Sequence, residues 1–137
     1  MVSRVETFKL QPITRQTMIK EIENLNPRKS VSSPISIKAL KIAKYYCADI
    51  LTACFNYHVV DRSEFPDELK LADIIPAYKK DSVAFDKGSY RPFGILPSLS
   101  KVIEKLISKQ FNPFTEKSFS KKHCGFRKGH STQHVLN

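Results

Sequence analysis

The longest periodic pattern of apolar residues in the sequence runs from Ile35 to about His58. Apolar residues recur there at intervals of three and four, which is the spacing of one face of an α-helix. The pattern predicts a core helix of roughly six turns. The residues expected on its buried face are Ile37, Leu40, Ala43, Cys47, Ile50, Leu51, Cys54, Phe55 and His58. With 41% apolar residues in a chain of 137, one modest hydrophobic core is expected.

A second helix is predicted upstream, over residues 12–25. Met18, Ile22 and Leu25 recur there at helical spacing. Thr14 is the expected N-cap, because a threonine hydroxyl accepts a hydrogen bond from a free N–H of the first turn. The stretch "NPRKSVSSP" that follows is rich in turn-forming residues and predicts a connector.

A third, amphipathic helix is predicted to begin at Ser98 or Ser100, either of which is a favourable N-cap. Its apolar stripe comprises Leu99, Val102, Ile103, Leu106, Ile107 and Phe111, and the opposite face carries Lys101, Lys105 and Lys109. Proline inside a helix costs roughly 3 kcal/mol. Pro113 is therefore expected to break or kink this helix near Asn112.

Two short segments that contain proline are predicted to be extended. "ADIIPAYKK" is expected to form a strand with Ile74 and Ile75 buried and with Pro76 limiting its ladder bonds. "YRPFGIL" is expected to form another, because a residue before proline is pushed out of the helical region. Paired across the loop "DSVAFDKGS", the two would make an antiparallel ribbon. The predicted fold class is α+β, rich in helix, with a short antiparallel β-ribbon.

The net charge is +10, and it is unevenly distributed. Residues 1–69 carry 10 Lys and Arg against 8 Asp and Glu, whereas residues 70–137 carry 13 against 5. The four glycines all lie in the second, more basic half. This combination favours loops in which backbone and cations approach phosphates. On charge alone, a basic surface without a partner is an open alternative.

Composition disfavours two other classes of protein. The first residues contain no apolar core of signal-peptide length. The most apolar run, "YYCADILTACF", is interrupted by Asp49 and is shorter than the roughly 20 residues that a membrane span needs. A soluble protein located inside the cell, in the cytoplasm or the nucleus, is expected.

The cysteines and histidines do not have the spacing of a disulfide framework or a zinc site. The three cysteines are Cys47, Cys54 and Cys124, an odd number without close pairs. A zinc module would have to draw its ligands from Cys47, Cys54, His58, His123, Cys124, His130 and His134. Zinc ligands usually come as close pairs from a turn, such as two cysteines separated by two to four residues, and none is present. No metal is therefore expected in this chain.

A cluster of cations is expected at the loop end of the ribbon. If the two extended segments pair, Lys79, Lys80 and Arg91 converge there. Arginine makes bidentate contacts with phosphates and lysine adds a mobile charge, so the cluster suits a triphosphate or a nucleic-acid backbone. The nearby aromatic residues Tyr78, Tyr90, Phe93 and Phe126 either stack on bases or fill the core, and for the two phenylalanines the core is expected.

Three motifs together resemble a known family. They are "FPDELKLADIIPAYKK", "SYRPFGILPSLSKVIEKLI" and "GFRKGHST". Their order and spacing are similar to those in reverse transcriptases of non-LTR retrotransposons, the LINE and Jockey-like group. The resemblance extends from about Phe8 to Asn137 and is specific because three separate motifs occur in register.

The resemblance implies a division of the chain and a role for six cations. Residues 1–69 would be a helical N-terminal extension, and residues 70–137 would be part of the fingers subdomain of a right-hand RNA-directed DNA polymerase. The implied phosphate contacts for the incoming nucleotide are Lys79, Lys80 and Arg91, and the implied template contacts are Lys101, Arg127 and Lys128. The implied partners are an RNA or DNA template-primer and a nucleoside triphosphate.

Catalysis in this family uses Mg²⁺ held by aspartates of the palm subdomain. The resemblance places those aspartates beyond residue 137, and Asp86 in "VAFDK" precedes the "YRP" motif and is interpreted as a loop carboxylate. A helix that begins at Ser131 or Thr132 has room for about one turn, which favours a segment of a larger fold. The chain is therefore expected to be a truncated piece of the polymerase, inactive alone. A free-standing basic nucleic-acid-binding module and an inert remnant are the alternatives.

Overall fold

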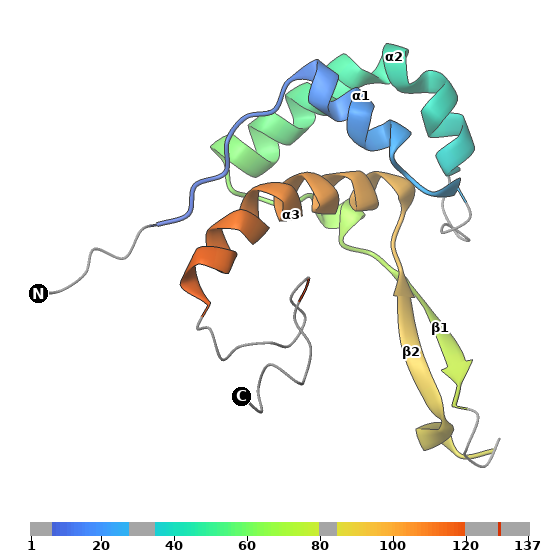
Figure 1. Ribbon diagram of the computed structural model, residues 1–137. Helices are drawn as coiled ribbons and strands as arrows, with labels where there is room; N and C mark the ends of the chain where they lie inside the picture. The colour runs from blue at the N-terminus through green and yellow to red at the C-terminus, as the bar shows by residue number, and fades with distance from the viewer. Residues whose placement is uncertain (1–6, 28–34, 80–84, 120–128, 130–137) are drawn as a thin grey trace, which may run out of the picture.

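The computed structural model of the chain describes residues 7–27, 35–79, 85–119 and 129. Its helices are α1 (Arg15–Glu23), α2 (Ile37–Cys54) and α3 (Ser98–Ser118), and its strands are β1 (Asp73–Tyr78) and β2 (Tyr90–Ile95). Figure 1 shows the helices gathered at one end of the molecule and the two strands projecting away from them. The prediction of a helix-rich α+β fold with an antiparallel ribbon is confirmed.

One apolar core holds the helices together. Its buried residues are Ile13, Met18, Ile19, Ile22, Leu25, Ile37, Leu40, Ala48, Phe55, Val59, Val102 and Leu106. They come from α1, α2, α3, the segments on either side of α1 and the π-helical turn Phe55–Asp61 that continues α2. Helices from both sides of residue 69 thus share this core. None of the helices in the described part of the chain is long and apolar enough to cross a membrane.

Helix α1 forms as the sequence predicts. Thr14 has extended backbone angles and its hydroxyl accepts a hydrogen bond from the Thr17 amide. Met18, Ile19 and Ile22 are buried. The cap satisfies one of the free N–H groups that every helix start exposes, and the apolar spacing then turns one face to the core.

The buried face of α2 is partly different from the predicted one. Ile37, Leu40 and Phe55 are buried as expected, but Ala43 and Ile50 are exposed. The physical reason is that α2 carries apolar residues on two opposite faces, and the face that packs on α1 is the one with Leu40 and Ala48. Periodicity alone shows that a face is apolar, not which neighbour covers it.

Helix α3 starts differently from the prediction, and Pro113 does not break it. Pro97 is at its N-cap, and the hydroxyls of Ser98 and Ser100 donate instead to the carbonyls of Ile35 and Leu69, at 2.8 Å each. The helix does not end near Asn112 but continues through Pro113 to Ser118. Its predicted apolar stripe is confirmed, with Val102 and Leu106 buried and Leu99, Ile103 and Ile107 packed beside them.

Two side-chain amides fasten the extended segment that precedes α1. Asn56 accepts from the Ile13 N–H at 2.9 Å and donates to the Ile13 carbonyl at 3.0 Å. Gln110 of α3 makes the same pair of bonds with Gln11, at 2.7 and 3.0 Å. Each side-chain amide bonds a backbone N–H and the C=O of the same residue, as a neighbouring β-strand would. These four hydrogen bonds hold the segment in place.

Candidate nucleic-acid interface

Two prolines fix how the ribbon strands pair. In the observed register Pro76 lies directly opposite Pro92. Proline has no N–H, so this rung must be one that makes no hydrogen bonds across the ribbon. Hydrogen-bonded rungs then fall on the odd-numbered residues, and the Lys79 amide accordingly donates to the Ser89 carbonyl at 2.8 Å. A slip by one residue would put a proline where a donor is required, which disfavours every neighbouring register.

This register places Lys79 and Arg91 on the same face of the ribbon. Arg91 lies opposite Ala77, and Lys79 follows two residues after Ala77. Side chains two apart on a strand share a face, and diagonal neighbours across an antiparallel pair lie roughly 7–8 Å apart. The register thus brings Lys79 and Arg91 to one face at the loop end of the ribbon, and their role in phosphate contacts stays a prediction. Lys80, the third member of the predicted cluster, lies outside the described residues.

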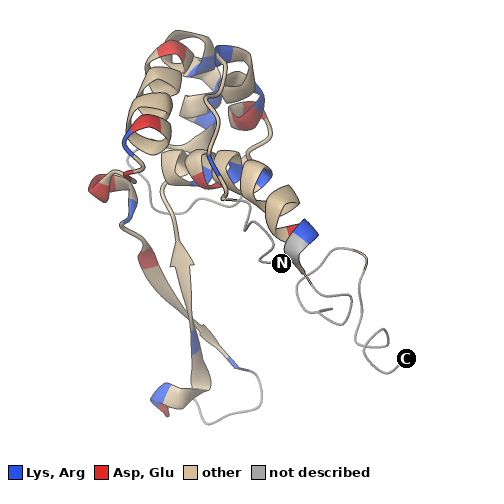
Figure 2. Ribbon diagram, turned by 90° about the vertical axis from the view of Figure 1, so that its left-hand side faces the viewer, with Lys and Arg blue, Asp and Glu red and all other residues tan. Residues whose placement is uncertain are grey.

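The distal end of the ribbon is rich in basic groups. The Lys79 ammonium donates to the Gly88 carbonyl at 2.6 Å, within the turn that closes the ribbon. Arg91 is exposed, and the described residues supply no ion pair to its guanidinium. Figure 2 shows basic positions along the distal part of the ribbon and in the turn at its tip.

Lys87 is a basic residue that the sequence-based prediction missed. It starts the short turn Lys87–Ser89 at the tip and is exposed. The signal in the sequence is the pair Asp86 and Gly88 around it, since the Asp86 carboxylate accepts from the Gly88 amide at 3.1 Å and fixes the turn. Lys87 thus adds a cation at the same end as Lys79 and Arg91.

The structure separates Lys101 from that cluster. Lys101 lies in the first turn of α3, beyond the other end of β2 from Arg91. The four residue steps from Arg91 to Ile95 alone span roughly 13 Å of strand. Lys101 instead lines an open groove of about 830 Å³ at the base of the ribbon, together with Gly94, Glu104 and Lys105. Of the predicted cations that the structure describes, Lys79 and Arg91 therefore lie together, and Lys101 lies apart from them.

Arg127 and Lys128, the remaining predicted template contacts, lie outside the described residues, so their roles stay predictions. The same holds for Phe126. Phe93 is described and is 55% exposed, so the expectation that it fills the core was wrong. Ile74 and Ile75 are likewise exposed, at 70% and 41%. Both faces of the ribbon lack a cover among the described residues, because no helix packs along it.

The rings of Tyr78 and Tyr90 occupy the opposite face of the ribbon from Lys79 and Arg91. Tyr78 and Tyr90 pair across the strands with ring centroids 5.6 Å apart. Both rings are more than a third exposed. Exposed tyrosines on a β-ribbon offer flat surfaces on which bases can stack.

Several other cations are committed to ion pairs within the helical part. Lys44 pairs with Glu23 at 2.7 Å, and this hydrogen bond raises the pKa of the Lys44 ammonium. Lys70 pairs with Asp67 at 2.5 Å and lowers the pKa of that carboxyl group. Lys109 of α3 pairs with the buried Glu21 of α1. These cations stabilise helix ends and helix contacts, which distinguishes them from Arg91.

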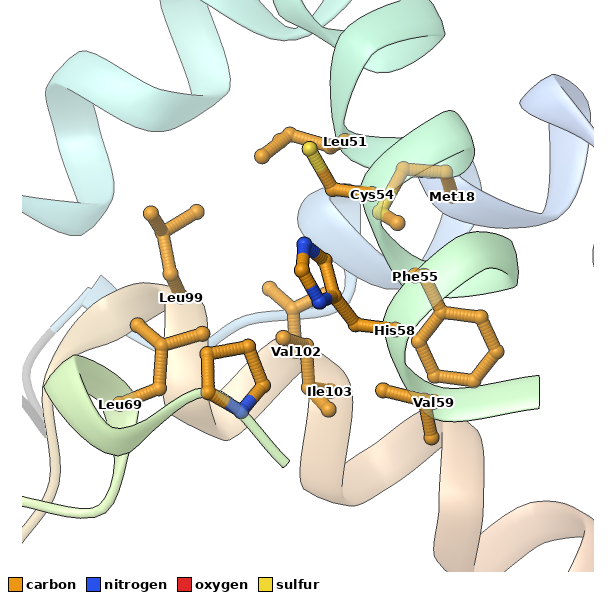
Figure 3. Close-up of a pocket in the computed structure, with 11 residues that line it drawn as sticks. Met18, Leu51, Cys54, Phe55, His58, Val59, Leu69, Leu99, Val102 and Ile103 are labelled. Carbon is orange, nitrogen blue, oxygen red and sulfur yellow. The ribbon is translucent and has the colours of Figure 1, made fainter. Parts of the chain in front are cut away.

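A separate pocket between the helices is apolar. It has a volume of about 240 Å³ and is lined by Met18, Leu51, Cys54, Phe55, His58, Val59, Pro66, Leu69, Leu99, Val102 and Ile103. Figure 3 shows the His58 imidazole surrounded by aliphatic side chains. A phosphate has no cation to meet in this pocket, so it does not suit a nucleotide.

The described residues do not fit a metal centre. Among them, no group of three or more His, Cys, Asp and Glu side chains could hold a metal ion. Cys47, Cys54 and His58 thus do not assemble a site by themselves, and the later histidines lie outside the described residues. The described carboxylates do not form such a group either, so they do not assemble a magnesium site.

Comparison with known proteins finds similarity to RNA-directed DNA polymerases of transposons and mobile elements. The chain is 32% identical over 130 residues to the probable RNA-directed DNA polymerase from transposon BS of Drosophila melanogaster, covering 90% of this chain and 14% of that protein. It is 32% identical over 125 residues to the probable RNA-directed DNA polymerase from transposon X-element of the same species, covering 89% and 13%.

A third relative is the RNA-directed DNA polymerase from mobile element jockey of Drosophila melanogaster, 32% identical over 102 residues, which cover 73% of this chain and 11% of that protein. The chain thus spans between 11% and 14% of the length of these relatives. No protein-family model matches it.

Proposed function

Because this chain is homologous over 90% of its length to an RNA-directed DNA polymerase of a non-LTR transposon, with similar matches to two others, we propose that it supplies template and nucleotide contacts of such a polymerase. The partners in this proposal are an RNA or DNA template-primer and a nucleoside triphosphate. The proposed location is intracellular, in the cytoplasm or the nucleus, where such templates occur.

The observation that carries the proposal is the shared face of Lys79 and Arg91 on an exposed ribbon. Arginine and lysine at a diagonal spacing of roughly 7–8 Å present a planar fork and a mobile point charge. A triphosphate offers several oxygens within that span, so both cations can engage the same ligand. Lys80, which follows Lys79 in the sequence, is proposed to add to the same phosphate contact.

Template contacts are proposed at the base of the ribbon. Lys101 and Lys105 both line the groove between α3 and the ribbon. Two cations one helical turn apart follow a phosphate backbone without reading its bases. Arg127 and Lys128 are proposed to add to this contact through the "GFR" motif.

The fingers assignment and the truncation belong to the same proposal. The 137 residues are proposed to bind the substrates of polymerisation without carrying the palm aspartates that hold Mg²⁺. Support comes from the small share of the relatives' length that the chain matches and from the described carboxylates, which are not grouped for a metal ion.

A non-catalytic basic nucleic-acid-binding module derived from such an element is the second candidate. The charge of the second half, 13 Lys and Arg against 5 Asp and Glu, favours it. Binding by this charge would release counterions and would weaken as salt rises. An inert remnant would show no binding at low salt.

The test measures binding of single-stranded RNA at several salt concentrations. For the wild-type chain, the logarithm of the binding constant should fall linearly with the logarithm of the salt concentration. Arg91→Gln should weaken binding several-fold and make the slope shallower by about 0.7, the value for one lost phosphate contact on a single strand. Lys79→Gln should act in the same direction.

Lys20→Gln is the matched control, because Lys20 is an exposed cation on α1, away from the ribbon. It removes the same charge and should leave the slope unchanged. Equal slopes for Arg91→Gln, Lys20→Gln and the wild type would contradict a ribbon contact. Binding that does not respond to salt would contradict phosphate recognition altogether.

A further inference from the structure

The outward face of α2 is an apolar stripe that no described element covers. We call Ala39, Ile42, Ala43, Tyr46, Ile50 and Ala53 the α2 stripe. Ile42 is 80% exposed, Tyr46 87% and Ile50 67%. A surface helix normally turns polar residues to water on the face opposite its core contacts. Here that face is apolar for about four turns, which marks it as a contact surface.

The α2 stripe is nearly symmetric about Tyr46. Ile42 and Ile50 lie four residues on either side of it, and Ala39 and Ala53 lie seven residues on either side. A second α2 that runs antiparallel across a two-fold axis at Tyr46 would set Ile42 of one copy against Ile50 of the other, and Ala39 of one copy against Ala53 of the other. Such self-complementarity is what a two-fold interface between identical chains requires.

We propose that two copies of this chain associate through antiparallel packing of their α2 stripes, with Tyr46 at the two-fold axis. The isoleucines fill the space on either side of the two tyrosines. The small alanines at the ends let the helices approach closely. This dimer is independent of the proposed nucleic-acid contacts, which involve the ribbon and α3.

Charges on one flank of the stripe fit the same arrangement. Lys38 and Asp49 lie within about 20° of each other around α2, so they share a flank. In the antiparallel pair, Lys38 of one copy lies on the same flank as Asp49 of the other and roughly 7.5 Å from it along the axis, so the two opposite charges attract across the interface. The Asp49 side chain, which also pairs with Arg15 at 2.9 Å, is 70% exposed. The two-fold axis repeats the pair at the other end, so these charges favour the antiparallel orientation.

The first test is the mass of the chain in solution across a range of protein concentrations, by sedimentation equilibrium. It is done near physiological ionic strength, because each copy carries a net charge of +10 that opposes association. The wild type should be in monomer–dimer equilibrium. Tyr46→Lys should raise the dissociation constant at least about tenfold, because it places two like charges at the centre of the interface.

Leu71→Lys is the control for added charge, since Leu71 is 72% exposed and lies outside the α2 stripe. It should leave the equilibrium close to that of the wild type. Both changes are at exposed positions, so the far-ultraviolet circular dichroism should be unaltered. A wild-type chain that stays monomeric at every concentration overturns the proposal.

The second test fixes the register by disulfide cross-linking in a chain whose native cysteines are replaced by serine. Tyr46→Cys should cross-link to itself, because the two-fold axis brings its two copies together. Ile42→Cys alone should not, since its two copies lie roughly 12 Å apart along the axis. A mixture of Ile42→Cys and Ile50→Cys chains should cross-link. Self-cross-linking of Ile42→Cys as efficient as that of Tyr46→Cys would refute the antiparallel register.

Discussion

At the scale of single residues, a few polar side chains decide how the N-terminal segment is held. Asn56 makes two hydrogen bonds with the backbone of Ile13, and Gln110 makes two with that of Gln11. The bonds of Asn56 are partly buried, whereas those of Gln110 are exposed. A buried donor or acceptor that loses its partner costs more than an exposed one, because water replaces the partner only at the surface.

Asn56→Ala should therefore lower the free energy of unfolding by about 1–3 kcal/mol. The cost arises because the N–H and C=O of Ile13 lose their partners next to the buried Ile13 side chain. Gln110→Ala removes the equivalent bonds at the surface and should cost under about 1 kcal/mol. Urea unfolding of both variants measures the difference, and equal losses would show that burial does not separate the two amides.

At the scale of elements, Pro113 shows how tertiary context overrides a local rule. Proline removes one hydrogen bond from a helix and crowds the preceding turn, yet α3 passes through Pro113. The stripe of Val102, Leu106 and their neighbours packs α3 on the core before that point. On the far side, the Thr115 hydroxyl donates to the Asn112 carbonyl at 3.0 Å. Burial of the first turns thus stabilises α3 enough for the helix to continue past Pro113.

Pro113→Ala should raise the free energy of unfolding by about 1–2 kcal/mol, because it restores a backbone donor inside α3. The gain is less than the full cost of an interior proline, since alanine also frees the unfolded chain. Glu116→Ala, an exposed change later in the same helix, should stay within about 0.5 kcal/mol of the wild type. If Pro113→Ala is destabilising under thermal or urea unfolding, the proline contributes a contact that outweighs the lost hydrogen bond.

The ribbon is the element whose stability depends most on contacts with other parts or ligands. Two strands alone are marginally stable in water, and both faces of this ribbon are exposed. Its prolines fix the register and remove donors from its outer edges, which disfavours addition of another strand. These features suit a ribbon that contacts a ligand through its side chains, as the proposed nucleotide and template contacts require.

At the scale of the whole molecule, the helical part and the ribbon have different roles. The helices form the core and pair several of their cations, such as Lys44 and Lys109, with carboxylates, whereas the distal ribbon presents basic groups at its tip. Positive charge at the end of a projecting element attracts polyanions before contact. The proposed polymerase role therefore places recognition in this chain and the chemistry elsewhere.

Under that proposal, the 137-residue chain should not extend a primer on an RNA or DNA template in the presence of Mg²⁺ and nucleoside triphosphates. The reason is that transfer of a nucleotidyl group needs carboxylates that hold two metal ions, and the described carboxylates are not so arranged. Primer extension followed on a denaturing gel measures this. Synthesis that depends on Mg²⁺ and is lost on heating the chain would contradict the proposal.

The sequence alone predicted the elements because their signals are local. Helical spacing and the Thr14 cap predicted α1, and the apolar stripe predicted α3. The residues that precede prolines predicted the two strands of the ribbon. Motif order also predicted the relationship to RNA-directed DNA polymerases of non-LTR transposons. Such signals depend on residues within a turn or two of each other, which the sequence contains in full.

Only the tertiary structure decided which apolar surfaces are buried. It turned Leu40 and Ala48 of α2 inward and left Ile42, Tyr46 and Ile50 outside, and it exposed Ile74 and Phe93 on the ribbon. It also separated Lys101 from Arg91. Burial depends on which neighbours pack against a face, and those neighbours come from distant parts of the chain. Hydrophobic spacing is the same whether a face meets the core or a partner.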